Sequence, residues 1–243
     1  TSYYFRGTAP NNHIKFGQNA EGQDMWWRII RFNGDGTVRM QYDGAGTSGT
    51  NSYTRGFALT GQVWNGTYND AKYVGWMFGG ANGSASTSRE QAQRNETDSP
   101  IKTKVDEWYK TNIVDTGYGN YVADSIFCND RSTPGKSATG WSSDTGLGYG
   151  NNSTAYGATA RVGGPWQTTV TQPRFTCPQE NDKFTVEAEN GGNGKSTYPV
   201  GLITADEIVA AGSGKYATAN SSYYLNKGSW YWSFSPYYTP NPF

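Results

Sequence analysis

The clearest hydrophobic pattern lies near the N-terminus, where two runs of strand-forming residues flank a turn. Residues 26–32 are rich in Trp, Ile and Phe, and residues 37–42 alternate apolar with polar. The alternation predicts an apolar face of Val38, Met40 and Tyr42 and a polar face of Arg39 and Gln41. Residues 33–36 read Asn-Gly-Asp-Gly, and Asn and Gly tolerate the positive φ of a tight turn. The sequence therefore predicts a β-hairpin over 26–43 rather than a calcium loop, which needs more spaced carboxylates and a distal Glu.

A helical pattern follows at residues 99–112. Ser99 is a suitable N-cap, and Pro100 fits the first helical position. The spacing predicts one buried apolar stripe, made of Ile101, Val105 and Trp108. The same spacing predicts a face toward water, made of Lys102, Lys104, Asp106 and Glu107.

A second helix is expected within residues 198–212. Thr204 and Glu207 stand in the order of a capping box, and Gly212 suits the C-terminal stop. Ile208 and Val209 are expected to point inward.

The remaining pattern favours short strands and ordered loops. Residues 73–78 read as a buried strand, and residues 223–236 as a β-type segment. With no internal repeat and no linker, we expect one α+β domain over residues 1–243.

Composition narrows the class of protein. The chain has 15% aromatic residues, including 9 Trp and 18 Tyr, which argues against disorder, and its 32 Gly argue against a helical bundle. Lys plus Arg equal Asp plus Glu at 20 each, without a block of one sign, so the charge footprint of a nucleic-acid binder is absent. No apolar run is long enough to span a membrane, so we expect no membrane span.

The two cysteines, Cys128 and Cys177, suggest one disulfide in a secreted chain, with two free buried thiols as the alternative. Such a bridge would pin the Trp- and Tyr-containing loop of residues 132–172. Secretion predicts an extracellular location.

Candidate chemistry is sparse, so we expect a non-enzymatic protein without a cofactor or metal. A Ser–His–Asp triad would need His13, the single histidine, and ligand counts argue against zinc. Paired carboxylates for sugar hydrolysis are an open alternative. Their candidates are Asp106, Glu107, Asp124, Asp130, Asp206 and Glu207.

Aromatic side chains in loops are the best functional signal, because Trp and Tyr stack on sugars and anchor protein partners. The expected contact residues are Trp141, Tyr149, Trp166, Tyr237 and Tyr238. The expected core tryptophans are Trp26, Trp27, Trp108 and Trp232.

Several segments together resemble a family of surface proteins of unassigned function from Bacilli and related Gram-positive bacteria. In chain order these segments are Tyr4-Phe5-Arg6-Gly7 with Asn11-Asn12, Trp27-Arg28-Ile29-Ile30-Arg31 with Asn33-Gly34-Asp35-Gly36, Tyr73-Val74-Gly75, Ile101-Lys102 with Asp106 and Trp108-Tyr109, Phe127-Cys128-Asn129-Asp130-Arg131-Ser132, Tyr198-Pro199-Val200-Gly201-Leu202-Ile203-Thr204-Ala205-Asp206-Glu207, and Tyr231-Trp232-Ser233-Phe234-Ser235-Pro236. The resemblance implies a C-type-lectin-like domain of two main helices, mostly antiparallel strands and long loops, displayed behind a prepilin-like N-terminal helix. It also implies that Cys128 and Cys177 are disulfide partners.

The chain departs from this family at its C-terminal end. Family members usually continue with further strands and a Gly-Val-Arg-Pro-like ending, so we expect that tail either to be absent from the given sequence or to come from another chain. The sugar–calcium motifs of true C-type lectins are also missing. The sequence thus predicts a recognition or adhesion domain whose partner is a glycan or a surface protein. The alternatives are a self-associating filament or pilus subunit, and an enzyme such as a glycosidase or a relative of the formylglycine-generating fold.

Overall fold

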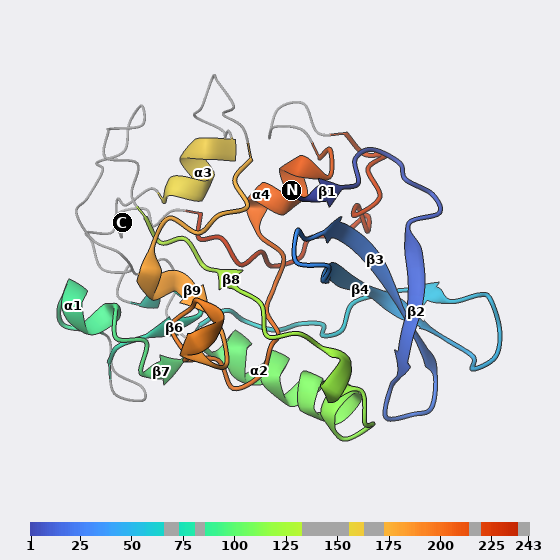
Figure 1. Ribbon diagram of the computed structural model, residues 1–243, viewed down its shortest axis with the longest axis horizontal. Coiled ribbons are helices and arrows are strands. Elements are labelled where there is room, and N and C mark those ends of the chain that lie inside the picture. Colours follow the sequence, from blue (N-terminus) through green and yellow to red (C-terminus); the bar gives the residue numbers. More distant parts are fainter. Residues whose placement is uncertain (66–72, 81–85, 133–155, 163–172, 214–219, 238–243) are drawn as a thin grey trace.

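The computed structural model describes residues 1–65, 73–80, 86–132, 156–162, 173–213 and 220–237. Within them the protein is α+β, with a twisted antiparallel sheet on one side and short helices and extended segments around it (Figure 1). The strands are β1 (Tyr3–Tyr4), β2 (His13–Gln18), β3 (Asp24–Phe32), β4 (Val38–Gly46), β5 (Thr54–Arg55), β6 (Met77–Phe78), β7 (Thr97–Asp98), β8 (Phe127–Cys128) and β9 (Lys183–Phe184). The α-helices are α1 (Arg89–Ala92), α2 (Pro100–Tyr109), α3 (Gly157–Val162) and α4 (Ala205–Ala210).

The predicted hairpin is the centre of the main sheet. Strand β3 pairs with β4 on one side and with β1 and β2 on the other, while β6–β7 and β8–β9 form separate pairs. The turn closes as predicted, because the Asn33 amide donates to the Thr37 oxygen and Gly36 has a φ of +88°. Two register shifts interrupt the β3–β4 pairing. At one of them, Gly44 is required, since a Cβ there would lie 2.0 Å from the Thr54 oxygen.

The burial of β4 differs from the prediction. Val38 is exposed, whereas Arg39 is buried with a residue exposure of 9%. The alternation from Val38 to Tyr42 is kept, because the nearby register shift adds Ile30 to β3 and no residue to this part of β4. The side that carries Arg39 is buried because distant segments cover it. Its burial is compensated by Glu207 and by the ring of Phe127.

Helix α2 forms where it was predicted, and the Ser99 side chain caps it by accepting from the Lys102 amide. Ile101 and Val105 are buried as predicted. Lys102 and Asp106, which were expected to face water, are buried as well. The ammonium of Lys102 is buried and donates to Asp98, Asp106 and Thr197. The prediction failed there because these partners come partly from a distant segment. After Tyr109 the chain continues as a π-helical turn, Lys110–Val114.

Helix α4 begins with the predicted capping box between Thr204 and Glu207 and ends before Gly212, whose φ is +106°. It is shorter than residues 198–212, because the preceding segment is extended. Ile208 is only partly buried, and the fully buried residues of the helix are Asp206, Glu207 and Ala210.

The C-terminal segment is not a strand within residues 220–237, and only Met77–Phe78 of the strand expected at 73–78 is paired. Trp26 is buried as expected. Trp27 and Trp108 pack partly buried against the cluster of Met25, Tyr109 and Ile113. Trp232 was wrongly assigned to the core, since it is 52% exposed.

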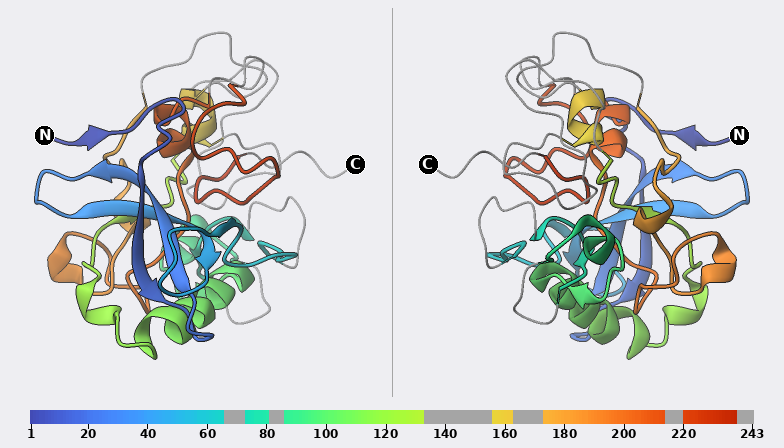
Figure 2. Two further views of the ribbon diagram at one scale, coloured as in Figure 1. Left: turned by 90° about the vertical axis from the view of Figure 1, so that its right-hand side faces the viewer. Right: turned by 90° about the vertical axis from the view of Figure 1, so that its left-hand side faces the viewer.

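Cys128 and Cys177 form the predicted disulfide, which ties β8 to the segment before β9. Figure 2 shows the sheet and α2 on one side of the molecule and α3 and α4 on another. No helix in the described ranges has the length and apolar character needed to cross a bilayer.

Candidate functional site

A cavity of about 1140 Å³ opens beside β4 and could hold a ligand. Its walls come from β4, α2 and the extended segments 57–62, 121–123 and 199–203. In Figure 1 the segment that leads into α4 runs beside the β3–β4 hairpin. We call this space the groove.

One wall of the groove is a strand edge. Every residue from Gly36 to Tyr42 lines the groove, whereas a space over one face of a strand would meet alternate residues. Strand β5 pairs with β4 only at Gly44 and Ala45. Among the described residues, Val38 to Tyr42 therefore have a strand neighbour on the β3 side alone, and their outer edge faces the groove.

A second wall of the groove is the backbone segment that leads into α4. Residues 199–203 line the groove consecutively. In the described part of the chain, the amide N–H groups of Gly201, Leu202 and Ile203 donate no hydrogen bond, although these residues are at least half-buried. Buried backbone groups are normally paired, so both walls offer unused hydrogen-bonding capacity to a ligand.

Aromatic side chains form the rim of the groove. Trp230 is 95% exposed, and Tyr121 is 77% exposed. Trp232 is held in place, since its Nε1 donates to the Gln62 oxygen at 2.9 Å and its ring packs edge-on against Trp64. Fixed, exposed rings of this kind are typical of recognition surfaces.

Three polar groups on the groove walls have no complete set of partners among the described residues. The Oε1 of Gln41 and the hydroxyl of Tyr109 are buried and accept or donate no hydrogen bond there. Arg39 contacts Glu207 only through Nε, at 3.3 Å, and its guanidinium carbon lies 3.7 Å from the centre of the Phe127 ring. Burial raises the pKa of Tyr109 to about 12, so its hydroxyl remains protonated near neutral pH.

The carboxylate of Glu207 is the ionic partner of Arg39. Burial raises the pKa of this carboxyl, but the charges of Arg39 and Arg31 outweigh burial and hold the pKa below its usual value. Burial likewise lowers the pKa of Arg39, and Glu207 opposes that shift. Arg31 also donates to Glu207. Two cations thus share one anion, and the cluster carries net positive charge toward the groove.

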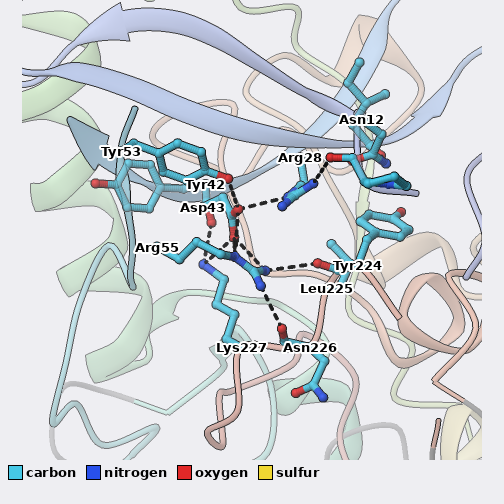
Figure 3. A network of polar contacts seen from close by, with 12 residues as sticks. Asn12, Arg28, Tyr42, Asp43, Tyr53, Arg55, Tyr224, Leu225, Asn226 and Lys227 are labelled. Carbon is cyan, nitrogen blue, oxygen red and sulfur yellow. Dashed lines mark hydrogen bonds and ion pairs between the residues drawn. The ribbon is translucent and has the colours of Figure 1, made fainter. Parts of the chain in front are cut away.

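A second polar network positions the rim. Figure 3 shows Arg28, Arg55 and Lys227 converging on the fully buried Asp43. Arg28 donates to Asp43 at 2.9 Å, and Tyr53 donates at 2.6 Å. Burial raises the pKa of Asp43, but hydrogen bonds from Arg55 and Tyr53 and the charge of Lys227 more than compensate, so the carboxyl remains ionised.

The same network ties the C-terminal segment to the sheet. Arg55 donates to the backbone oxygens of Tyr224 and Asn226, both at 3.0 Å (Figure 3). Lys227 donates to the Tyr42 oxygen at 2.8 Å and to the Gly56 oxygen. These bonds fix the start of the segment that carries Trp230 and Trp232 along the mouth of the groove.

Most of the contact residues expected from the sequence are not tested by this geometry. Trp141, Tyr149, Trp166 and Tyr238 lie outside the described residues. Tyr237 is described and is 43% exposed. It does not line the groove.

The carboxylates considered for hydrolysis have structural partners and do not line the groove. Asp130 and Asp206 both bind Arg161, at 2.6 and 2.7 Å. Asp124 accepts from the backbone of Val186 and Glu187. Asp106 pairs with Lys102, Glu107 with Lys104, and Glu207 with Arg31 and Arg39.

The ring of His13 packs against Trp26 and Tyr53, and its Nδ1 has no hydrogen-bond partner within the described ranges. No cluster of three or more potential metal ligands occurs in those ranges.

Sequence reasoning missed Arg39, Gln41 and Tyr109 as site residues. The first two were assigned to the solvent side of a regular strand, and Tyr109 ends a helix whose pattern predicts core packing. No local signal marked Arg39, because Asp35 and Asp43 lie four positions from it and its actual partner, Glu207, is distant in the sequence.

Comparison of the chain with protein-family models, with curated proteins and with solved structures found no significant match. The functional argument therefore rests on the groove itself.

Proposed function

We propose that this protein is a non-enzymatic extracellular recognition domain that binds a partner polypeptide in the groove beside β4. The fold proposed with it is C-type-lectin-like, and the proposed setting is a Gram-positive-type cell surface. The disulfide and the α+β architecture are compatible with secretion.

One observation carries the proposal, namely that two backbone segments with unused hydrogen-bonding groups, the outer edge of β4 and residues 199–203, line the same apolar groove. An added strand would pair with such walls through its main chain and fill the pockets between them with alternate side chains. A glycan would use the exposed rings of Trp230 and Trp232 but would leave the amides of the walls unpaired.

Hydrogen–deuterium exchange of the intact protein tests this function. Peptides of alternating Val and Thr, eight residues long, serve as probes, and a glycan array serves as the competing arm. Binding of a peptide should slow amide exchange in residues 38–42 and 201–203 and leave the turn at 19–23, which does not line the groove, unchanged. Binding of glycans alone, or of peptides without protection of these amides, would contradict the proposal.

A rim variant provides a matched test. Trp232→Ala should weaken peptide binding, whereas Tyr3→Ala, which removes a ring that is 71% exposed but remote from the groove, should not. Equal effects of the two variants would show that general surface hydrophobicity drives the binding.

The second candidate is a structural subunit of a surface filament. The open edge of β4 favours it, because an unpaired edge can pair with another copy of the same chain. Light scattering against concentration distinguishes the two functions. A monodisperse monomer supports recognition of a separate partner, and ordered polymers that dissociate when the peptide is added support the filament.

A further inference from the structure

The charged side chains that line the groove all have the same sign. Of the described residues that line it, Arg31, Arg39 and Lys227 are cations, and none is Asp or Glu. The anions that stabilise these cations, Glu207 and Asp43, lie behind the walls and are almost completely buried. A ligand in the groove therefore meets positive potential in a space with little water to screen it.

The three cations are not equally available to a ligand. Lys227 already donates to the oxygens of Tyr42 and Gly56 and lies 3.5 Å from Asp43. Arg31 donates to Glu207 and Asn33. Arg39 differs, because a guanidinium has five N–H donors, and its one ion pair among the described residues joins Nε to Glu207 at 3.3 Å.

Its surroundings prepare Arg39 to receive an acceptor group. The ring of Phe127 covers one face of the guanidinium, which leaves its edge for in-plane hydrogen bonds. The side chain is about 10% exposed, so the edge faces the groove rather than open solvent. Gln41, two residues along β4, lines the same groove.

We infer that the groove selects a partner strand that carries an Asp or Glu side chain, whose carboxylate binds the free edge of the Arg39 guanidinium. The inference rests on the proposed function, since it names the chemistry of the strand that the groove would accept. A carboxylate matches the two parallel donors of a guanidinium. Arg39 is thus a specificity residue rather than a structural one.

A positional peptide array tests the inference with the intact protein. Peptides of alternating Val and Thr carry Glu, Gln or Lys at each position in turn. At one position, Glu should bind about tenfold or more tighter than Gln, and Lys should bind weakest. The preference for Glu should decrease as salt is raised.

Variants of Arg39 connect the preference to this residue. Arg39→Gln should remove the difference between Glu and Gln peptides, and Arg39→Lys should retain part of it. Arg39→Glu should favour the Lys peptide. Glu207 keeps Arg31 as a partner in each variant, which preserves the fold. Arg94→Gln, an equal loss of charge at an exposed residue outside the groove, is the matched control.

The outcomes separate the inference from the function on which it rests. Peptides that protect the amides of β4 but bind equally with Glu and Gln would overturn the inference and leave the recognition of strands intact. Absence of binding by every peptide would overturn the proposed function as well. A preference for Glu that survives Arg39→Gln would assign the selectivity to another group and also contradict the inference.

Discussion

Arg39 and Arg131 are the two buried arginines among the side chains that the structure describes, and their surroundings differ. Arg131 donates through Nε to Asp182, through Nη1 to the oxygens of Met77 and Ala92, and through Nη2 to Asn95. Its side chain is 0% exposed, as is that of Asp182. Arg39 lies beside the groove with one ionic contact, to Glu207.

We call the surroundings of Arg131 the closed region, because all donors of its guanidinium are used, and the groove beside Arg39 the open region. A buried charge whose donors are all used stabilises one arrangement of the chain, whereas a buried charge with free donors is costly until a ligand supplies the acceptors. Arg131 joins residues from segments 77, 92–95 and 182 and is structural. Arg39 has the environment of a binding residue.

The largest loss of stability should follow from replacing Arg131 in the closed region. Arg131→Met leaves Asp182 buried without its counter-charge and should lower the free energy of unfolding by about 3–5 kcal/mol, measured by urea denaturation. The double variant Arg131→Met with Asp182→Leu should recover part of this loss, because no unpaired charge remains. A loss below about 1 kcal/mol in the single variant would contradict the assignment of Arg131 to a closed network.

Removal of the disulfide should cause the second largest loss of stability, because the disulfide tethers the chain next to the closed region. Replacement of both Cys128 and Cys177 by Ser should lower the free energy of unfolding by about 2–4 kcal/mol, through the greater entropy of the unfolded chain. Reduction of the unaltered protein should give the same loss in the same urea assay. A loss much smaller after reduction than in the variant would assign the effect to packing of the sulfur atoms instead.

The free energy of unfolding should depend on pH through Lys227, which lines the groove of the open region. Burial lowers the pKa of Lys227 to about 8 from an ordinary value of 10.5. Above pH 8 the folded protein releases a proton that the unfolded chain keeps until about pH 10.5, so the stability should rise with pH in this window. The rise between pH 7.5 and 9.5 should be about 2 kcal/mol by urea denaturation.

Lys227→Met should flatten this profile, and Lys104→Met, at a side chain that is 49% exposed, should not. An unchanged slope in Lys227→Met would assign the titration to another group.

The smallest effect on stability should come from Arg39 itself. Arg39→Met should change the free energy of unfolding by less than about 1 kcal/mol, because Glu207 keeps Arg31 and its capping bond to Thr204. A loss as large as that of Arg131→Met would show that both arginines are structural, and the comparison between a closed and an open region would fail.

The features that the sequence predicted correctly are those set by neighbouring residues. The Asn33–Gly36 turn, the Ser99 cap and the Thr204–Glu207 capping box depend on contacts within a few positions, and such contacts are read from local patterns. The disulfide was also anticipated, because two cysteines allow only one pairing within the chain. The α+β class followed from the mixture of these elements.

The tertiary structure alone decided which side chains are buried at irregular positions and where the groove lies. Distant segments cover the side of β4 that carries Arg39, and Glu207, from a helix far along the chain, made its burial tolerable. Trp232 is exposed because its nitrogen bonds to Gln62 and the segment carrying it does not join the sheet. The physical reason is that burial of a charge, and the lack of a described strand on the outer edge of Val38 to Tyr42, are properties of distant segments packed together, which no local pattern of residues contains.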